Sequence, residues 1–197
     1  MHLRPAFVET DLDRIADLVA RHSFGLLVTM QGGLDASHVP FTIERDGDAL
    51  VLGGHLAAGN RQCALFNGAA ALAVFGGPHA YVSPTWYKTQ PSVPTWDYAA
   101  VHIHGHLEAV AEDGEMRGTL RALSAHDATF DMERLPADYM AGMMRGIRAF
   151  RLRSERIEAQ WKMSQNRSIA DRQGVIDALR AQGSHDVADL ITATLPG

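Results

Sequence analysis

The stretch Phe24-Gly25-Leu26-Leu27-Val28-Thr29-Met30, followed by Gly32-Gly33, decides the fold class. An apolar run of this length that ends at a pair of glycines is typical of a buried strand entering a hairpin. Strand-like runs continue beyond it over 36–44, 49–53 and 69–75, and Asp46-Gly47 marks a second turn. Short strands joined by tight turns predict an antiparallel sheet.

Helical periodicity surrounds these strands. A capping-box variant at Thr10 and apolar residues at helical spacing predict a helix near 11–22. Other helices are expected at 60–66, 115–125, 136–146 and, in two parts divided at Gly183, 168–195. The remaining strands are expected over 101–110, 147–153 and 156–162. The pattern predicts an α+β protein in which the sheet closes into a barrel.

Length and composition are those of an ordinary globular protein. The 197 residues are 46% hydrophobic and 21% charged, and no repeat or linker divides them. We expect residues 1–167 to form one domain and residues 168–197 to form a helical extension packed on it. Cys63 is the single cysteine, no apolar run reaches the roughly 20 residues of a membrane span, and the N-terminal residues lack a secretory signal. These features predict a cytoplasmic protein without an internal disulfide.

The charge balance does not favour a nucleic-acid partner. The formal net charge is −5, whereas proteins that bind phosphate backbones usually carry a basic surplus. Even residues 151–197 hold seven Lys and Arg against six Asp and Glu. DNA therefore remains a possible partner, but the charge of the protein does not support DNA binding.

Several common catalytic motifs are absent. The sequence has no GxGxxG or GxxxxGK[ST] loop and no HExxH, CxxC or GxSxG motif, so Rossmann, zinc-hydrolase and nucleophile-elbow chemistry have no sequence basis. His102, His104 and His106 alternate along an expected strand and therefore leave one face. Two of them could bind a metal, but no acidic or cysteine ligand is adjacent. We interpret them as a polar face and predict no metal.

The glycine-rich segment 53–61 joins an expected strand to an expected helix. Free N–H groups at the start of a helix suit a phosphate. Asn60 or Arg61 could add a side-chain donor. A simple glycine-rich turn explains the same composition equally well.

Two other segments contain candidate binding residues. Segment 162–167, Lys162-Met163-Ser164-Gln165-Asn166-Arg167, holds two cations, an amide pair and a hydroxyl without balancing acids. This density of donors indicates an acceptor-rich partner such as phosphate, flavin or an opposing subunit; a solvated turn before an N-cap at Ser168 is the alternative. Segment 80–98 is interrupted by prolines but rich in large aromatic residues, which favours function over disorder.

Eight blocks of sequence follow one another in unbroken order: Ser23-Phe24-Gly25-Leu26-Leu27-Val28-Thr29, Ser37-His38-Val39-Pro40, Gly54-His55-Leu56-Ala57, Gly77-Pro78-His79-Ala80-Tyr81-Val82-Ser83-Pro84, Trp86-Tyr87, Val93-Pro94-Thr95-Trp96-Asp97-Tyr98, Val101-His102-Ile103-His104-Gly105 and Met163-Ser164-Gln165-Asn166-Arg167. Together they resemble the PaiB family, also described as FMN-binding negative transcriptional regulators. The resemblance extends from about Met1 to the 170s.

The resemblance implies a split β-barrel related to pyridoxamine-phosphate oxidases and flavin reductases, with peripheral helices and a C-terminal helical tail. It implies FMN bound at the interface of a homodimer, and a role in repressing genes for protease production and sporulation. The residues expected to contact the cofactor form four groups: His38, Val39 and Pro40 at the edge of the flavin ring; His55, Ala58, Asn60 and Arg61 at the phosphate; Trp86, Tyr87 and Trp96 beside the ring; and Lys162, Ser164, Gln165, Asn166 and Arg167 across the dimer interface.

Three other functions remain open at this point. The protein could be an FMN-dependent oxidoreductase that acts on a small molecule, because the flavin carries its own redox chemistry. It could be a dimeric barrel that binds no cofactor and acts through protein contacts. Haem bound through a histidine is the third alternative, since related barrels include haem-handling members. No catalytic residue is predicted.

Overall fold

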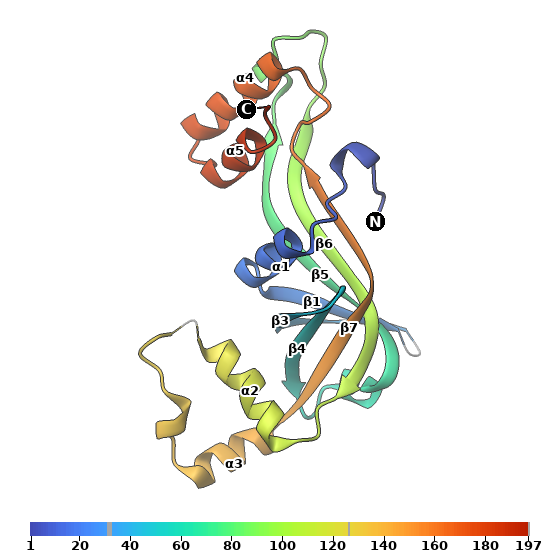
Figure 1. The fold of residues 1–197 in the computed structure, drawn as a ribbon, viewed down its shortest axis with the longest axis vertical. Coiled ribbons are helices and arrows are strands. Elements are labelled where there is room, and N and C mark those ends of the chain that lie inside the picture. Colours follow the sequence, from blue (N-terminus) through green and yellow to red (C-terminus); the bar gives the residue numbers. More distant parts are fainter. Residues whose placement is uncertain (31–32, 126, 197) are drawn as a thin grey trace. The chain divides into compact units, whose positions relative to one another are not determined.

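The computed structural model describes residues 1–30, 33–125 and 127–196. Its contacts divide the chain into two compact units. The first unit comprises Met1–Asp11, Gly76–Val101 and Glu158–Gly197, and the second comprises Leu12–Phe75 and His102–Ile157. Strands β5, β6 and β7 contribute residues to both units (Figure 1). The domain boundary expected between residues 167 and 168 stays a prediction.

Seven strands form one sheet in the order β2-β1-β5-β6-β7-β4-β3. Their bounds are β1 Phe24–Met30, β2 Leu34–Pro40, β3 Thr42–Asp46, β4 Ala49–Ala57, β5 Asn67–Val82, β6 Thr95–Ala109 and β7 Ile147–Lys162. β1 pairs antiparallel with β2 and with β5, and β4 pairs antiparallel with β3 and with β7. The predicted α+β class with an antiparallel sheet is confirmed.

The helices agree closely with the sequence pattern. They are α1 Leu12–Arg21, α2 Asp113–Ser124, α3 Ala137–Arg145, α4 Ile169–Ala181 and α5 His185–Thr192, with 3-10 helices η1 Pro5–Phe7, η2 Arg61–Leu65, η3 Pro84–Trp86 and η4 Met132–Arg134. Gly183, with φ of 80°, separates α4 from α5 as predicted. Among the helices of the described residues, none has the length and apolar character that crossing a membrane requires.

Four phenylalanines form the centre of the second unit. The rings of Phe41 and Phe75 meet edge to face at 5.1 Å, and Phe150 lies 6.0 Å from Phe41 and 5.0 Å from Phe66. All four side chains are buried. The first unit has its own core, in which buried residues of α4 and α5 pack together: Val175, Ile176, Leu179, Val187 and Ile191.

Two strand boundaries differ from the prediction because of this phenylalanine core. The single strand expected over 36–44 is divided into β2 and β3 at Phe41, whose N–H donates to Ser23 O at 2.9 Å while its ring enters the core. The strand expected over 49–53 continues to Ala57. At Gly54 an added Cβ would lie 2.8 Å from Phe150 Cζ. This glycine therefore allows a close approach inside a strand and does not mark its end.

Three other strands are longer than predicted. β6 begins at Thr95, within the segment 80–98 that was expected to be interrupted by prolines, and not at Val101. β5 passes through Gly76-Gly77-Pro78, where the sequence pattern predicted its end. The strands expected over 147–153 and 156–162 are one strand, β7. Near its middle, Ser154 Oγ accepts a hydrogen bond from Leu50 N at 2.9 Å and so continues the connection to β4. The turn predicted at Gly32-Gly33 falls partly outside the described residues, although Met30 and Leu34 on either side are paired.

Candidate functional site

The predicted binding residues fall into one group in each unit. The first unit contains Trp86, Tyr87, Trp96, Lys162, Ser164, Gln165, Asn166 and Arg167; the second contains His38, Val39, Pro40, His55, Ala58, Asn60 and Arg61.

In the first unit, the end of β7 is held to the start of β6 by a group that we name the Lys162 cluster: Thr95, Asp97, Lys162 and Ser164. Lys162 Nζ donates to Thr95 Oγ1 at 2.7 Å and to the carbonyl oxygen of Trp96, and it lies 3.2 Å from Asp97 Oδ1. Ser164 Oγ donates to Asp97 Oδ2 at 2.6 Å. Asp97 and Thr95 were not predicted as site residues. The sequence feature that could have indicated Asp97 is its position between Trp96 and Tyr98, where an alternating strand places an acidic side chain on the buried face.

Asp97 is fully buried, with 0% of its surface exposed. Burial raises the pKa of its carboxyl group, while the hydrogen bond from Ser164 and the ammonium of Lys162 lower it. A buried carboxylate is tolerated only where charge and hydrogen bonds compensate its lost hydration. The Lys162 cluster provides both.

Arg167 and Tyr87 form a second contact in the first unit. The guanidinium carbon of Arg167 lies 4.3 Å from the centre of the Tyr87 ring, which is cation–π geometry. Burial raises the pKa of the Tyr87 phenol, although Ser164 and Arg167 act against it. Tyr87 Oη is buried beside these two side chains.

The amide pair of segment 162–167 divides between two roles. Gln165 Oε1 accepts from Met163 N at 2.7 Å and its Nε2 donates to Trp161 O at 2.6 Å, so both ends of this amide stabilise the turn. Asn166 is exposed. Gln165 therefore explains the shape of the segment, and Asn166 is the amide that remains accessible.

Aromatic side chains gather beside the Lys162 cluster. Trp96 is 55% exposed, and its ring lies 6.0 Å from that of Tyr81 and 6.2 Å from the His79 imidazole. Trp86 is half-buried in the segment between β5 and β6. Because the carbonyl oxygen of Trp96 accepts a hydrogen bond from Lys162 Nζ, the exposed indole and the ammonium lie at the same residue of β6.

In the second unit, Asn60 belongs to a buried hydrogen-bond network. Its Oδ1 caps η2 by accepting from Gln62 N at 2.9 Å, and its Nδ2 donates to Ser37 Oγ at 3.0 Å. Gln62, which is 1% exposed, donates from Nε2 to Thr29 Oγ1 at 2.9 Å. Sequence reasoning missed Gln62, because only the folded chain brings β1, β2 and η2 together.

The helix expected over 60–66, after the glycine-rich segment 53–61, is not an α-helix. It is a 3-10 helix of five residues, too short to carry the partial charge of a long α-helix. Arg61 pairs with Asp35, and Ala58 N donates to Gly146 O at 2.8 Å. His55 has a half-buried ring whose Nδ1 lacks a hydrogen-bond partner in the described part of the chain, and burial lowers its pKa. Binding of phosphate by this segment stays a prediction.

The strand predicted to face the flavin ring is β2. It lies at one end of the sheet order and pairs with β1; an edge strand of this kind can offer backbone groups to a ligand. Val39 is buried, whereas His38 is exposed and its ring stacks on Phe24 at 5.6 Å. Pro40 is half-buried at the end of the strand.

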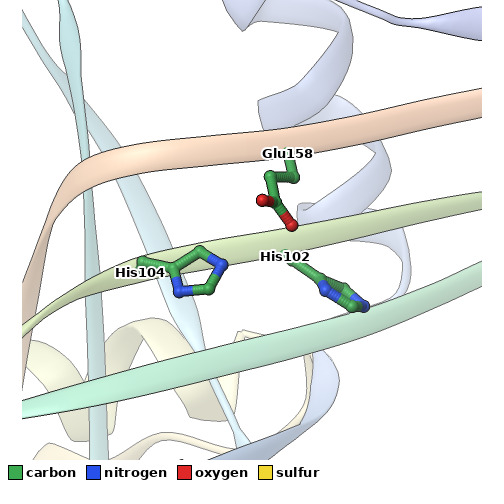
Figure 2. A group of neighbouring side chains, drawn as sticks. All are labelled: His102, His104 and Glu158. Atoms are coloured by element: carbon green, nitrogen blue, oxygen red, sulfur yellow. The ribbon is translucent and has the colours of Figure 1, made fainter. Parts of the chain in front are cut away.

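The histidines of β6 were interpreted as a polar face. His102 and His104 extend from β6 in the second unit (Figure 2). His104 Nδ1 lies 3.0 Å from Arg156 Nη2, and His106 Nδ1 lies 2.8 Å from Glu155 Oε1. The interpretation of these histidines as a polar face stays a prediction.

Comparison with solved structures identifies the class of protein. The fold resembles the flavocytochrome Anf3 from Azotobacter vinelandii, with a TM-score of 0.62 and 12% identity, over 81% of this chain and 72% of that chain. It also resembles the FAD and heme binding protein from Mycobacterium smegmatis, with a TM-score of 0.55 and 17% identity, over 79% of this chain and 73% of that chain. These likenesses concern the fold alone, and they confirm the predicted split barrel.

Within that class, the chain belongs to the family described as "Putative FMN-binding domain", whose model matches residues 1–156. Its cofactor is FMN. A relative from Bacillus subtilis (strain 168), "Protease synthase and sporulation protein PAI 2", is 33% identical over 186 residues, which cover 91% of this chain and 89% of the relative. The resemblance to the PaiB family is confirmed.

Proposed function

We propose that this chain binds FMN through the predicted residue groups and acts, as a homodimer in the cytoplasm, as a regulator of the PaiB type. The observation that carries the proposal is the Lys162 cluster, where a cation fixed by three acceptors adjoins the exposed indole of Trp96. An aromatic face and a nearby positive charge suit the isoalloxazine ring. The half-buried ring of His55 adds a polar atom, Nδ1, that has no hydrogen-bond partner among the described residues.

The chain's residues bind and orient the cofactor in this proposal, and FMN supplies electron transfer when bound. Segment 55–61 contributes to the phosphate end, the edge of β2 to the polar edge of the ring, and segment 162–167 a positive charge. A purified protein with the two-peaked visible spectrum of a flavin supports this assignment. A colourless protein, or one with the intense single band of haem, contradicts it.

The phosphate end is tested by replacing Asn60 with alanine. We expect affinity for FMN to fall roughly ten- to a hundredfold while affinity for riboflavin changes little, because one hydrogen bond to a charged group contributes about 1.5–3 kcal/mol. Fluorescence titration with both flavins measures the two affinities.

The matched control for this experiment is Ser37→Ala, which removes the acceptor of the Asn60 amide and leaves the amide itself in place. It perturbs the same network, so a structural effect of Asn60→Ala should appear in both variants. Equal loss of FMN and riboflavin in Asn60→Ala would exclude Asn60 from the phosphate site.

A second prediction concerns the coupling of FMN to dimerisation. The exposed rings of Tyr81 and Trp96 form an apolar surface that a second subunit could cover. If FMN binds at that interface, the dimer should be tighter with FMN than without it, as linkage requires. Sedimentation velocity at sub-micromolar protein measures this difference. A monomer that retains full affinity for FMN contradicts the proposal.

An FMN-dependent oxidoreductase is the second candidate, and the exposure of Trp96 favours it because a flavin on this surface would be open to a small substrate. Anaerobic mixing of the FMN-loaded protein with NADH and NADPH separates the two functions. Rapid bleaching of the flavin supports the oxidoreductase. A flavin that stays oxidised supports the regulator.

A further inference from the structure

The ammonium of Lys162 has no hydrogen left for a ligand. A lysine carries three N–H donors, and here Thr95 Oγ1, the Trp96 carbonyl and Asp97 Oδ1 are the three acceptors. All three belong to consecutive residues at the start of β6. Lys162 therefore acts on a neighbouring molecule as a fixed positive charge and not as a hydrogen-bond donor.

Asp97 determines how much of that charge is compensated. It is the single acid of the Lys162 cluster, and burial strengthens its interaction with the ammonium because the local dielectric constant is low. An aspartate at this distance cancels a large part of the field of the lysine. The charge that a ligand experiences therefore depends on both residues.

Asp97 also reaches the second cation of segment 162–167. Ser164 has φ of 56°, a left-handed conformation that non-glycine residues rarely adopt. The hydrogen bond from its Oγ to Asp97 holds it there, and its carbonyl accepts from Arg167 N at 2.9 Å. The turn that directs Arg167 over the Tyr87 ring is thus anchored on the same carboxylate.

We propose that Asp97 is a positioning residue that holds both cations of segment 162–167 and limits the positive charge they present to bound FMN. This inference rests on the proposed placement of the flavin at that segment. Oxidised FMN has a neutral ring, whereas the reduced ring carries a negative charge near neutral pH. A change in the local charge therefore alters the ratio of the affinities for reduced and oxidised FMN, which is measured as the reduction potential.

The first variant is Asp97→Asn, which keeps the size of the side chain and an oxygen acceptor but removes the negative charge. The uncompensated charge of Lys162 should raise the ratio of the affinity for reduced FMN to the affinity for oxidised FMN roughly tenfold. For a two-electron couple this corresponds to a reduction potential about 30 mV higher. The measurement is an anaerobic redox titration of the full chain saturated with FMN.

Two further variants separate charge from structure. Lys162→Met removes the ammonium and should lower the ratio. The effect should be largest at high pH, where the buried Asp97 carboxyl, whose pKa the lysine no longer lowers, is ionised. The double variant has neither charge and should return to within about threefold of the original ratio, which is the signature of two directly coupled residues. Ser164→Ala keeps both charges of the Lys162–Asp97 pair but releases the turn that holds Arg167. Its ratio should therefore change by less than that of Asp97→Asn, even where total affinity falls.

The outcomes distinguish this inference from the placement of the flavin. If Lys162→Met lowers the ratio but Asp97→Asn leaves it unchanged, the role of Asp97 is wrong and the placement stands. If neither variant alters the ratio, both are wrong. Should Asp97→Asn not fold, Lys162→Met is compared with the double variant, whose lack of buried charge favours folding; a ratio that does not rise on adding Asp97→Asn overturns the inference.

Discussion

Replacement of Phe150 by alanine should lower the free energy of unfolding by about 3–5 kcal/mol, the usual cost of truncating a buried phenylalanine. The side chain is fully buried and lies between the rings of Phe41 and Phe66. The ring also occupies the space that a side chain would need at Gly54, where an added Cβ would lie 2.8 Å from Phe150 Cζ, and glycine has no side chain that could fill the cavity. Urea unfolding followed by circular dichroism measures the change.

The control for this variant is Phe130→Ala, in a side chain that is 46% exposed. It removes the same atoms, and its effect should stay below about 1 kcal/mol because little apolar surface is uncovered. Similar losses in the two variants would show that Phe150 does not organise the core of the second unit.

The second large effect is expected for Gly174→Ala in α4. A Cβ at this position would lie 2.2 Å from the carbonyl oxygen of Trp86, so α4 and the segment around Trp86 would have to separate. Overpacking of this kind costs about 1–3 kcal/mol. Since Trp86 and Tyr87 are proposed to contact the flavin, affinity for FMN should fall together with stability.

A matched glycine is available in α2. Gly118 is also helical, but no atom lies within 4 Å of its added Cβ. Gly118→Ala should therefore stabilise the protein by about 0.5–1 kcal/mol, because alanine loses less backbone entropy in a helix. Urea unfolding and titration with FMN are carried out on both variants. A Gly174→Ala protein that behaves like Gly118→Ala would refute the close packing of α4 on Trp86.

The site could be predicted from sequence only in part. The motif blocks predicted the family and the cofactor, and the density of donors indicated segment 162–167. Residue spacing could not show that both ends of the Gln165 amide form hydrogen bonds within the turn, or that Asn60 forms hydrogen bonds with Ser37 and Gln62. Asn60 and Ser37 are brought together only by the folded sheet, and the local bonds of Gln165 and of Asn60 with Gln62 depend on the backbone conformation of the turns.

Local chemistry by itself determined the elements whose causes are local. β1 has the predicted bounds, and the helices near 11–22, 115–125 and 136–146 and the pair divided at Gly183 all form. Apolar periodicity, caps and left-handed glycines act within a few residues, so a single sequence contains the information for them.

Tertiary structure decided the features that depend on contacts across the chain. The chain bends at Phe41 because its ring has partners at Phe75 and Phe150, and β4 continues through Gly54 because that glycine accommodates Phe150. Lys162 meets an acid 65 residues earlier in the chain. From the sequence, a lysine in a donor-rich segment without nearby acids is expected to be a free cation. In the folded chain it forms an ion pair with the buried Asp97. The low dielectric constant around the buried carboxylate strengthens this pair.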